Sequence, residues 1–369
     1  MRRFSMGYAI TERSTSVVTI CRQIEPLPPG ANLGFIYATD HYADELDLLV
    51  AELRGRTKVS NWVGTVGIGL SVGDKEYFDT PAIVVLVGAF PADGFRVFAT
   101  TSRSMSPVVR THGSWYRPRE RHLAVVHGDP NSIHTPELLR ALVGELPGGF
   151  AVGGIVSSRG SHTQIANSLV QGAVSGVIFN ELVPVYTALT QGCIPIGPSR
   201  QVTDCERNLI RTLDGRPAID VLREDIGELL ARKLNRINGY IFTGLLIPNT
   251  NDYTVRNLIA IDRGQGWIAI GEWPRIGQSI LFCRRDANQA RENLEKILAN
   301  LMRRVPRPPQ AALYFSCFSR GERIFGIAGI EQRLIRSYLG DIPLIGFYAN
   351  GEVSYNNIHG YAGVVTVFL

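Results

Sequence analysis

The chain has 369 residues, of which 45% are hydrophobic and 19% are charged, with a formal charge of +5 at pH 7 and a pI near 9.0. This length and composition are typical of a globular protein with two or three domains, each with its own buried core. Helical membrane spans are excluded because no segment approaches about 18 uninterrupted apolar residues, and the five scattered cysteines, which lack CxxC spacing, argue against a disulfide framework and a thiolate zinc site.

The N-terminal segment, residues 1–32, starts with basic residues but lacks the apolar core of a secretory signal. It ends in the proline-rich sequence EPLPPGAN, which favours an extended lead-in, with one edge strand over residues 16–20. We therefore expect a cytoplasmic, soluble protein.

Three later stretches repeat one layout, an apolar strand, a helix, a second strand that ends in a glycine loop, and a further apolar strand. The copies start at Leu33, His122 and Ala312, and their further strands cover residues 81–90, 172–179 and 361–369. So long a period predicts related α/β units rather than a solenoid, and the fold class is α/β, two modules of repeated strand-helix-strand-strand units with mixed sheets. The glycine loops are either tight turns or walls of a ligand pocket, because open α/β sheets bind ligands beyond the carboxyl ends of their strands.

Strand-rich segments begin at Val183 and at Tyr240, and a helix is predicted between them over residues 223–237. Asp214-Gly215 predicts a hairpin. A second helix, residues 286–304, and a proline-rich linker lead into the third repeat. We place the boundary between the modules near residue 235.

The positive charge is diffuse and comes almost entirely from arginine, with no basic block longer than Arg303-Arg304. No motif interleaves basic and aromatic residues. We therefore expect neither a nucleic-acid partner nor a membrane partner.

Four motifs, LTQGCIPIGP, LDGRPAIDVL, YFSCFSRG and IPLIGFYANGEV, resemble the FIST family in their order and spacing. The resemblance assigns residues 33–234 to a FIST N-like module and residues 235–369 to a FIST C-like module. It implies a sensory protein of signal transduction, not an enzyme, that binds an amino acid or a similar small polar molecule. The partner it implies is a separate signalling output protein, such as a histidine kinase or a cyclase. Two alternatives stay open, a non-covalent haem-binding nitric oxide sensor and a protein-interaction scaffold without a small ligand.

The strongest candidate contacts lie in the third repeat. Arg320 and Glu352 would bind the carboxylate and the amino group of an amino acid, and their loops should face each other because both follow parallel strands at one sheet edge. Cys317 is either a thiol whose pKa Arg320 lowers or a buried small hydrophobe. The predicted ligand site comprises Cys317, Arg320, Gly346, Phe347, Tyr348, Gly351 and Glu352 of the third repeat and Gly153, Gly154, Ser157 and Ser158 of the second.

The remaining alternatives concern haem and catalysis. The ligand-binding interpretation requires no cofactor, whereas non-covalent haem would need one axial ligand, for which His162 is the candidate, and the absence of CxxCH argues against covalent haem. A catalytic triad of Cys317, His359 and Glu352 is plausible by residue type. It requires all three groups within hydrogen-bond reach, and the family resemblance points away from it.

Overall fold

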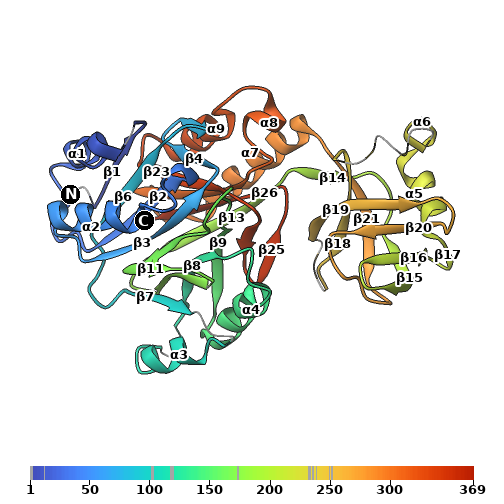
Figure 1. Ribbon diagram of the computed structural model, residues 1–369, viewed down its shortest axis with the longest axis horizontal. Coiled ribbons are helices and arrows are strands. Elements are labelled where there is room, and N and C mark those ends of the chain that lie inside the picture. Colours follow the sequence, from blue (N-terminus) through green and yellow to red (C-terminus); the bar gives the residue numbers. More distant parts are fainter. Residues whose placement is uncertain are drawn as a thin grey trace. The chain divides into compact units, whose positions relative to one another are not determined.

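The computed structural model describes residues 3–369 apart from residues 12, 101–103, 117–119, 173, 232–233, 235–236, 238, 249 and 251. The chain forms two compact units, unit 1 (Met1–Thr190 and Leu294–Leu369) and unit 2 (Gln191–Asn293), which is inserted into the sequence of unit 1 (Figure 1). The predicted α/β class with mixed sheets is confirmed. Within the described ranges, no helix combines the length and the apolar character needed to cross a bilayer.

Unit 1 contains the three repeats, and each is longer than the sequence pattern predicts, because one more strand and one more helix precede it. The first repeat consists of β1 (Phe4–Ala9), α1 (Arg13–Ile24), β2 (Leu33–Thr39), η1 (Asp40–Tyr42), α2 (Leu46–Thr57), β3 (Asn61–Gly67), β4 (Gly69–Val72), β5 (Lys75–Phe78) and β6 (Ile83–Gly88). The second consists of β7 (Phe95–Thr100), α3 (Ser106–His112), β8 (Leu123–Gly128), α4 (Thr135–Glu145), β9 (Phe150–Ile155), β10 (Gln164–Ala166), β11 (Ser168–Val170) and β12 (Val174–Phe179). The third consists of β13 (Val185–Gln191), α7 (Ala287–Arg304), β22 (Ala311–Cys317), α8 (Glu322–Phe325), α9 (Ile330–Leu339), β23 (Leu344–Ala349), β24 (Glu352–Ser354), β25 (Asn357–His359) and β26 (Ala362–Phe368).

The edge strand expected over residues 16–20 is wrong, because this segment lies inside α1. Its run of β-branched residues favours a strand by propensity alone. However, Val17, Ile20 and Ile24 recur at helical spacing and are buried against the first sheet, and this burial outweighs the propensity.

The three repeats exchange hairpins in a cycle. The sheets have the strand orders β1-β6-β2-β3-β10-β11, β7-β12-β8-β9-β24-β25 and β13-β26-β22-β23-β4-β5. The first and second strands of the sequence pattern, which are β2 and β3, β8 and β9, and β22 and β23, are parallel in each sheet. The final strand of each repeat, which is β6, β12 or β26, is antiparallel to the first strand of the pattern. The hairpin at the end of each sheet comes from a different repeat, so that the three repeats are interlocked.

One glycine occupies the same position in the second strand of every repeat, at Gly64, Gly153 and Gly346. A Cβ atom at these positions would lie 1.8, 2.0 and 1.7 Å from the carbonyl oxygen of the residue opposite on the first strand. No side chain fits at such distances. The close approach of the parallel strands therefore requires these glycines, which supports a role in the fold.

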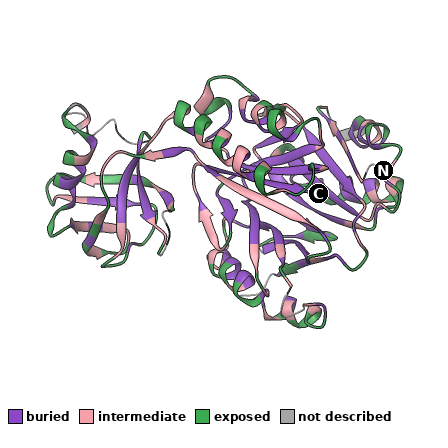
Figure 2. Ribbon diagram, turned by 180° about the vertical axis from the view of Figure 1, so that it is seen from behind, coloured by how far each residue is buried: buried purple, intermediate pink, exposed green. Residues whose placement is uncertain are grey.

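The central core of unit 1 forms where the inner faces of the three sheets meet, and Figure 2 shows their strands as largely buried. Tyr37, His127 and Phe315 occupy equivalent positions in the first strands of the three repeats and surround Phe347. The ring centroid of Phe347 lies 5.1, 6.0 and 5.7 Å from those of Tyr37, His127 and Phe315. Helices α1 and α2, α3 and α4, and α7 and α9 pack on the outer faces of the first, second and third sheets.

Unit 2 is built on a closed ring of six antiparallel strands. Its elements are β14 (Cys193–Pro195), β15 (Arg200–Glu206), β16 (Leu209–Leu213), β17 (Arg216–Pro217), α5 (Ala218–Ile226), α6 (Glu228–Ala231), β18 (Ile241–Leu246), β19 (Tyr253–Asp262), β20 (Trp267–Ile270) and β21 (Ser279–Arg285). The ring runs β21-β15-β16-β20-β19-β18 and closes because β18 also pairs with β21. Strand β14 pairs with the C-terminal part of β21, along the same edge whose N-terminal part pairs with β15.

The hairpin predicted at Asp214-Gly215 is confirmed, and both residues have positive φ angles, of 50° and 75°. The helix predicted over residues 223–237 starts earlier, at Ala218, and breaks at Gly227, whose φ is 79°. Residues 232–233 and 235–236 of the predicted helix lie outside the described residues.

Candidate functional site

Arg320 follows strand β22, as predicted, but its guanidinium is committed to a partner within the protein. The side chain is completely buried, and its Nε and Nη2 atoms donate hydrogen bonds of 2.9 and 2.6 Å to Oε1 of Glu331 on α9. Nη1 donates a bond of 3.3 Å to the carbonyl oxygen of Tyr361. The positive charge is therefore neutralised by a buried ion pair that ties α9 to the third sheet.

Glu331 is held by further donors besides Arg320. The Tyr314 hydroxyl donates to Oε1 at 2.7 Å, while Ser316 Oγ and the Gly321 amide donate to Oε2, both at 3.2 Å. These contacts satisfy both oxygens of a carboxylate with no exposed surface. No pattern along the sequence indicated this partner, which lies on α9, beyond the short helix α8.

Tyr348 was predicted as a residue of the ligand site, yet its hydroxyl belongs to a second buried polar group. The hydroxyl donates to Oε2 of Glu76 on β5 and accepts a bond of 3.0 Å from Nε2 of Gln332. Burial raises the pKa of Glu76 despite the hydrogen bond from Tyr348, which lowers it. Phe347, on the other face of β23, lies in the central core.

The structure brings Cys317, Glu352 and His359 close to one another. Glu352 and His359 are opposite each other on the β24–β25 hairpin, and the carboxyl of Glu352 is near enough to Cys317 to raise its pKa. Glu352 Oε2 accepts a bond of 3.0 Å from the Ala362 amide, while Oε1 is buried with no hydrogen-bond partner among the described residues. Burial raises the pKa of Glu352 well above its usual range.

Of the two interpretations of Cys317, the structure supports the buried thiol rather than the thiol activated, through a lowered pKa, by Arg320. The guanidinium does act in that direction, but burial, reinforced by Glu352, dominates and raises the pKa of Cys317 to about 12. Because this pKa lies well above 7, the residue is a protonated thiol at neutral pH. Only a thiolate is an effective nucleophile or metal ligand. Cys317 therefore lies near Glu352 as a protonated thiol and is not an activated nucleophile.

The predicted residues of the second repeat also face protein atoms. A Cβ atom on Gly154 would lie 2.6 Å from Cβ of Ala349. Ser157 Oγ accepts a bond of 3.1 Å from the Ile68 amide and donates to the Tyr348 carbonyl. Ser158 Oγ accepts a local bond of 3.0 Å from the Gly160 amide.

Gly351 has a φ of 153°, and a Cβ atom there would lie 2.7 Å from Cγ2 of Ile358. Glu352, next to it, pairs with Gly154 across β24 and β9, so the two predicted glycine loops do meet. The two loops thus meet where β24 of the third repeat joins β9 in the second sheet, rather than at one edge of the third sheet, and protein fills the space around these glycines.

His162 lies at the surface, half-buried, and its Nδ1 atom is 3.2 Å from Nδ2 of Asn131. A half-exposed ring that already has a polar partner does not provide the apolar enclosure of a haem site, so these residues do not fit haem. His127 is the histidine of the central core, where burial lowers its pKa to about 3 and its Nε2 atom lies 3.3 Å from the Tyr37 hydroxyl.

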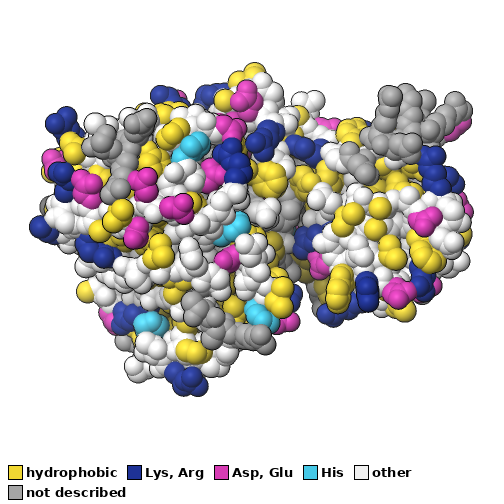
Figure 3. Space-filling model, viewed as in Figure 1, with side chains coloured by type: hydrophobic (Ala, Val, Ile, Leu, Met, Phe, Trp, Pro, Cys, Tyr) yellow, Lys and Arg dark blue, Asp and Glu magenta, His cyan; other side chains and the backbone are white. Residues whose placement is uncertain are grey.

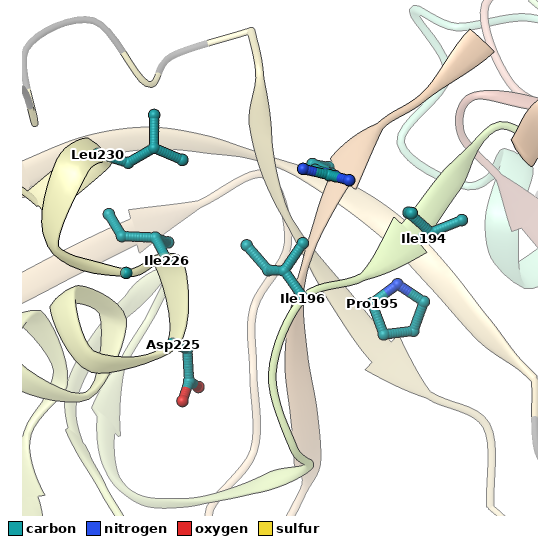
Figure 4. Close-up of a pocket in the computed structure, with 8 residues that line it drawn as sticks. Ile194, Pro195, Ile196, Asp225, Ile226 and Leu230 are labelled. Atoms are coloured by element: carbon teal, nitrogen blue, oxygen red, sulfur yellow. The ribbon is translucent and has the colours of Figure 1, made fainter. Parts of the chain in front are cut away.

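Unit 2 contains a pocket of about 370 Å³ that the sequence did not reveal (Figure 4). It is lined by residues from β14, α5, α6 and β21, namely Ile194, Pro195, Ile196, Asp225, Ile226, Gly227, Leu230 and Arg284. Figure 4 shows the side chains of Ile226 and Leu230 on one side, that of Ile194 on the other and that of Ile196 between them. The walls therefore combine aliphatic side chains with polar groups.

The two charged residues of the pocket, Asp225 and Arg284, differ in how completely other residues pair with them. Asp225 has an ion pair with Arg200, whose Nε and Nη2 atoms lie 3.1 and 2.5 Å from the carboxylate oxygens. Arg284 has one loose ion pair, 3.6 Å from Nη2 to Oδ2 of Asp286, and its Nε atom is buried without a hydrogen-bond partner among the described residues. The Nε–H group of Arg284 thus lacks an acceptor among the described residues, and an anionic or hydrogen-bond-accepting group of a ligand would supply one.

The FIST N domain matches residues 32–216 of the chain and the FIST C domain matches residues 218–355. The protein belongs to the FIST family, as the motifs predicted. FIST domains are classed as small-ligand-binding sensory domains of signal transduction.

Two mycobacterial proteins illustrate how the chain resembles its relatives. It is 29% identical over 354 residues to "Uncharacterized protein Rv0628c" of Mycobacterium tuberculosis strain H37Rv, covering 91% of each chain. It is 30% identical over 324 residues to "Uncharacterized protein Mb0898c" of Mycobacterium bovis, covering 83% of this chain and 82% of the relative. The similarity therefore extends over both units.

Proposed function

We propose that this FIST protein senses a small molecule with an apolar body and a carboxylate group, such as an apolar amino acid, and binds it in the pocket of unit 2. The observation that carries the proposal is a pocket that combines aliphatic side chains with one incompletely paired cation, Arg284. A volume of about 370 Å³ lies in the range of small-molecule sites. A separate signalling protein would receive the output.

The chemistry of the lining residues selects the ligand class. Ile194, Ile196, Ile226 and Leu230 gain from burying a branched or linear hydrocarbon, whereas they cannot satisfy a sugar or a nucleobase. The guanidinium of Arg284 matches a carboxylate, which can accept two parallel hydrogen bonds from it. Asp225 is neutralised by Arg200, so it does not cancel the attraction of an anion.

The test is a thermal-shift screen of the full-length protein against apolar amino acids, 2-oxo acids and short fatty acids, followed by calorimetry of each compound that stabilises it. Arg284→Gln should weaken binding by about 10- to 100-fold, because a charge-assisted hydrogen bond contributes about 1.5–3 kcal/mol. Ile196→Trp should abolish binding by filling the pocket. The matched control is Arg285→Gln, which changes the next residue on the same strand and should leave affinity unchanged. A ligand whose affinity survives Ile196→Trp would contradict the assignment.

The predicted site in unit 1 is a second candidate location, favoured by the buried Oε1 atom of Glu352 that has no hydrogen-bond partner among the described residues. An amino group placed there would meet an acceptor, with Cys317 and Arg320 beside it. Glu352→Gln would then weaken binding while Ile196→Trp would not. This pair of variants distinguishes the two locations.

Haem binding is tested separately by the ultraviolet-visible spectrum of protein purified from haem-supplied cells. A stoichiometric Soret band that moves with nitric oxide and is lost in His162→Ala would establish the haem alternative. A colourless protein that binds no compound in the screen would instead favour the third interpretation, a protein-interaction scaffold without a small ligand.

A further inference from the structure

The loop between β20 and β21, residues 271–278, presents two large apolar side chains to solvent. Trp273 is 72% exposed and Ile276 is 68% exposed. Figure 3 shows hydrophobic side chains open on the face of unit 2 it depicts, with Lys or Arg side chains near them. A tryptophan held in water forgoes most of the stabilisation that its burial would give, so its exposure on a loop indicates a contact made with another molecule.

The loop is anchored rather than loose. Between the two exposed side chains Pro274 is buried, and its carbonyl accepts a bond of 3.4 Å from Cys205 Sγ. The Arg275 amide donates to Oε1 of Gln278 at 3.0 Å, and the Gly277 amide donates to the Val202 carbonyl at 2.8 Å. Fixing the backbone in advance lowers the entropic cost of binding.

Two arginines give this surface its charge. Arg275 lies within the loop, and Arg207 lies next to it, because the neighbouring Asn208 exchanges hydrogen bonds of 2.9 and 3.3 Å with Ile270. Both arginines are exposed and have no ion-pair partner among the residues that the structure describes. Glu272, the acidic residue of the loop, is neutralised by Arg256, whose Nε lies 2.5 Å from Oε2.

We propose that this loop is the docking site for the separate signalling protein, and that Trp273 and Ile276 enter an apolar groove on that protein whose rim carries carboxylates. Tryptophan and arginine are the residues that contribute most at protein interfaces, and the arginines select a negatively charged rim. A second copy of this chain fits less well, because a two-fold contact through the loop would place Arg207 and Arg275 against their own counterparts. The proposal rests on the proposed sensory function, which requires an output partner, and it does not depend on which ligand unit 2 binds.

The partner is found by replacing Trp273 with the photo-crosslinker p-benzoylphenylalanine in the full-length chain in its native cells, and by identifying the crosslinked peptide. Crosslinking alone does not support the proposal, so the identified protein is purified and its affinity for the wild-type chain is measured. Trp273→Ala should weaken binding by about 30-fold or more, as expected for a central interface residue. Arg275→Glu should also weaken it, and a lysine in place of the partner's crosslinked-site carboxylate should restore binding to that variant.

The matched control is Ile133→Ala, which removes an apolar side chain that is 82% exposed on unit 1. It should change the affinity by less than about twofold. Three results would overturn the proposal. These are crosslinks only to another copy of this chain, Trp273-dependent binding to anionic lipid vesicles with no protein partner, and a purified partner whose affinity is the same for wild type and Trp273→Ala.

Discussion

Replacing Arg320 with methionine tests whether this buried arginine stabilises unit 1 or is available to a ligand. The variant removes two hydrogen bonds to Glu331 and one to the Tyr361 carbonyl, and it leaves the carboxylate of Glu331 buried without its counter-charge. Removing one member of a buried ion pair costs about 3–5 kcal/mol. The remaining donors to Glu331, which include the Tyr314 hydroxyl, reduce this loss without cancelling it.

Hydrogen–deuterium exchange measures the loss where it occurs, since the two units need not unfold together. Peptides from α9 and β22 should exchange about a hundredfold or more faster in Arg320→Met, while peptides from β19 in unit 2 should not change. Arg323→Met, a change of an exposed residue on the neighbouring helix α8, is the control and should cost less than about 0.5 kcal/mol. If Arg320→Met behaved like this control, the ion pair would not be structural and the guanidinium would be free to bind a ligand.

Three further predictions concern unit 1. Gly346→Ala should destabilise it by about 3 kcal/mol or more in urea titrations, because the new Cβ would lie 1.7 Å from a carbonyl oxygen. The control, Gly144→Ala in α4, has open space around it and should stabilise unit 1 by about 0.5–1 kcal/mol. Equal effects of the two substitutions would refute the close packing at Gly346. With a pKa of about 12, Cys317 should resist iodoacetamide at pH 8 in the native protein. Mass spectrometry should find the partly exposed Cys205 modified first, and rapid labelling of Cys317 would contradict its burial. The pKa of His127 is about 3 in the folded state, below its unfolded value of about 6.5. As the pH falls from about 6.5 towards 3, the unfolded state therefore takes up the proton first, and the free energy of unfolding of wild type should fall by about 1.4 kcal/mol per pH unit relative to His127→Phe. Parallel pH profiles of the two proteins would show that the ring is not neutral in the fold.

Much of the fold of unit 1 follows from patterns along the sequence. The strand-helix-strand order and the parallel pairing were predictable, because they depend on local periodicity and on the geometry of α/β units. The glycines were predicted in the loops after the second strands, whereas the ones that the packing requires lie inside those strands. The exchange of hairpins among the repeats was not predictable, since short strands such as β24 and β10 carry no signal of which sheet they join. The helix α1 was missed because its β-branched residues resemble a strand until the buried face is known.

The candidate sites show the same limit. Sequence placed Arg320 and Glu352 at one sheet edge, yet it could not show that Glu331 neutralises Arg320, because that contact depends on how α9 packs. The pocket of unit 2 joins residues from segments as far apart as Ile194 and Arg284. The motif LTQGCIPIGP contributes Ile194 and Ile196 to it, but nothing in the motif itself indicates a cavity.

The most direct test of ligand binding in unit 2 is a titration followed by methyl nuclear magnetic resonance of isoleucine-labelled full-length protein. Each compound that stabilises the protein in the thermal screen is added, and the methyl signals are assigned by single substitutions. Binding in unit 2 should give saturable shifts of the Ile194, Ile196 and Ile226 methyl groups, and Arg284→Gln should move their midpoint to about 10- to 100-fold higher ligand concentration. Shifts confined to Ile358, which packs against Gly351 beside Glu352, would place the ligand in unit 1 and contradict the account.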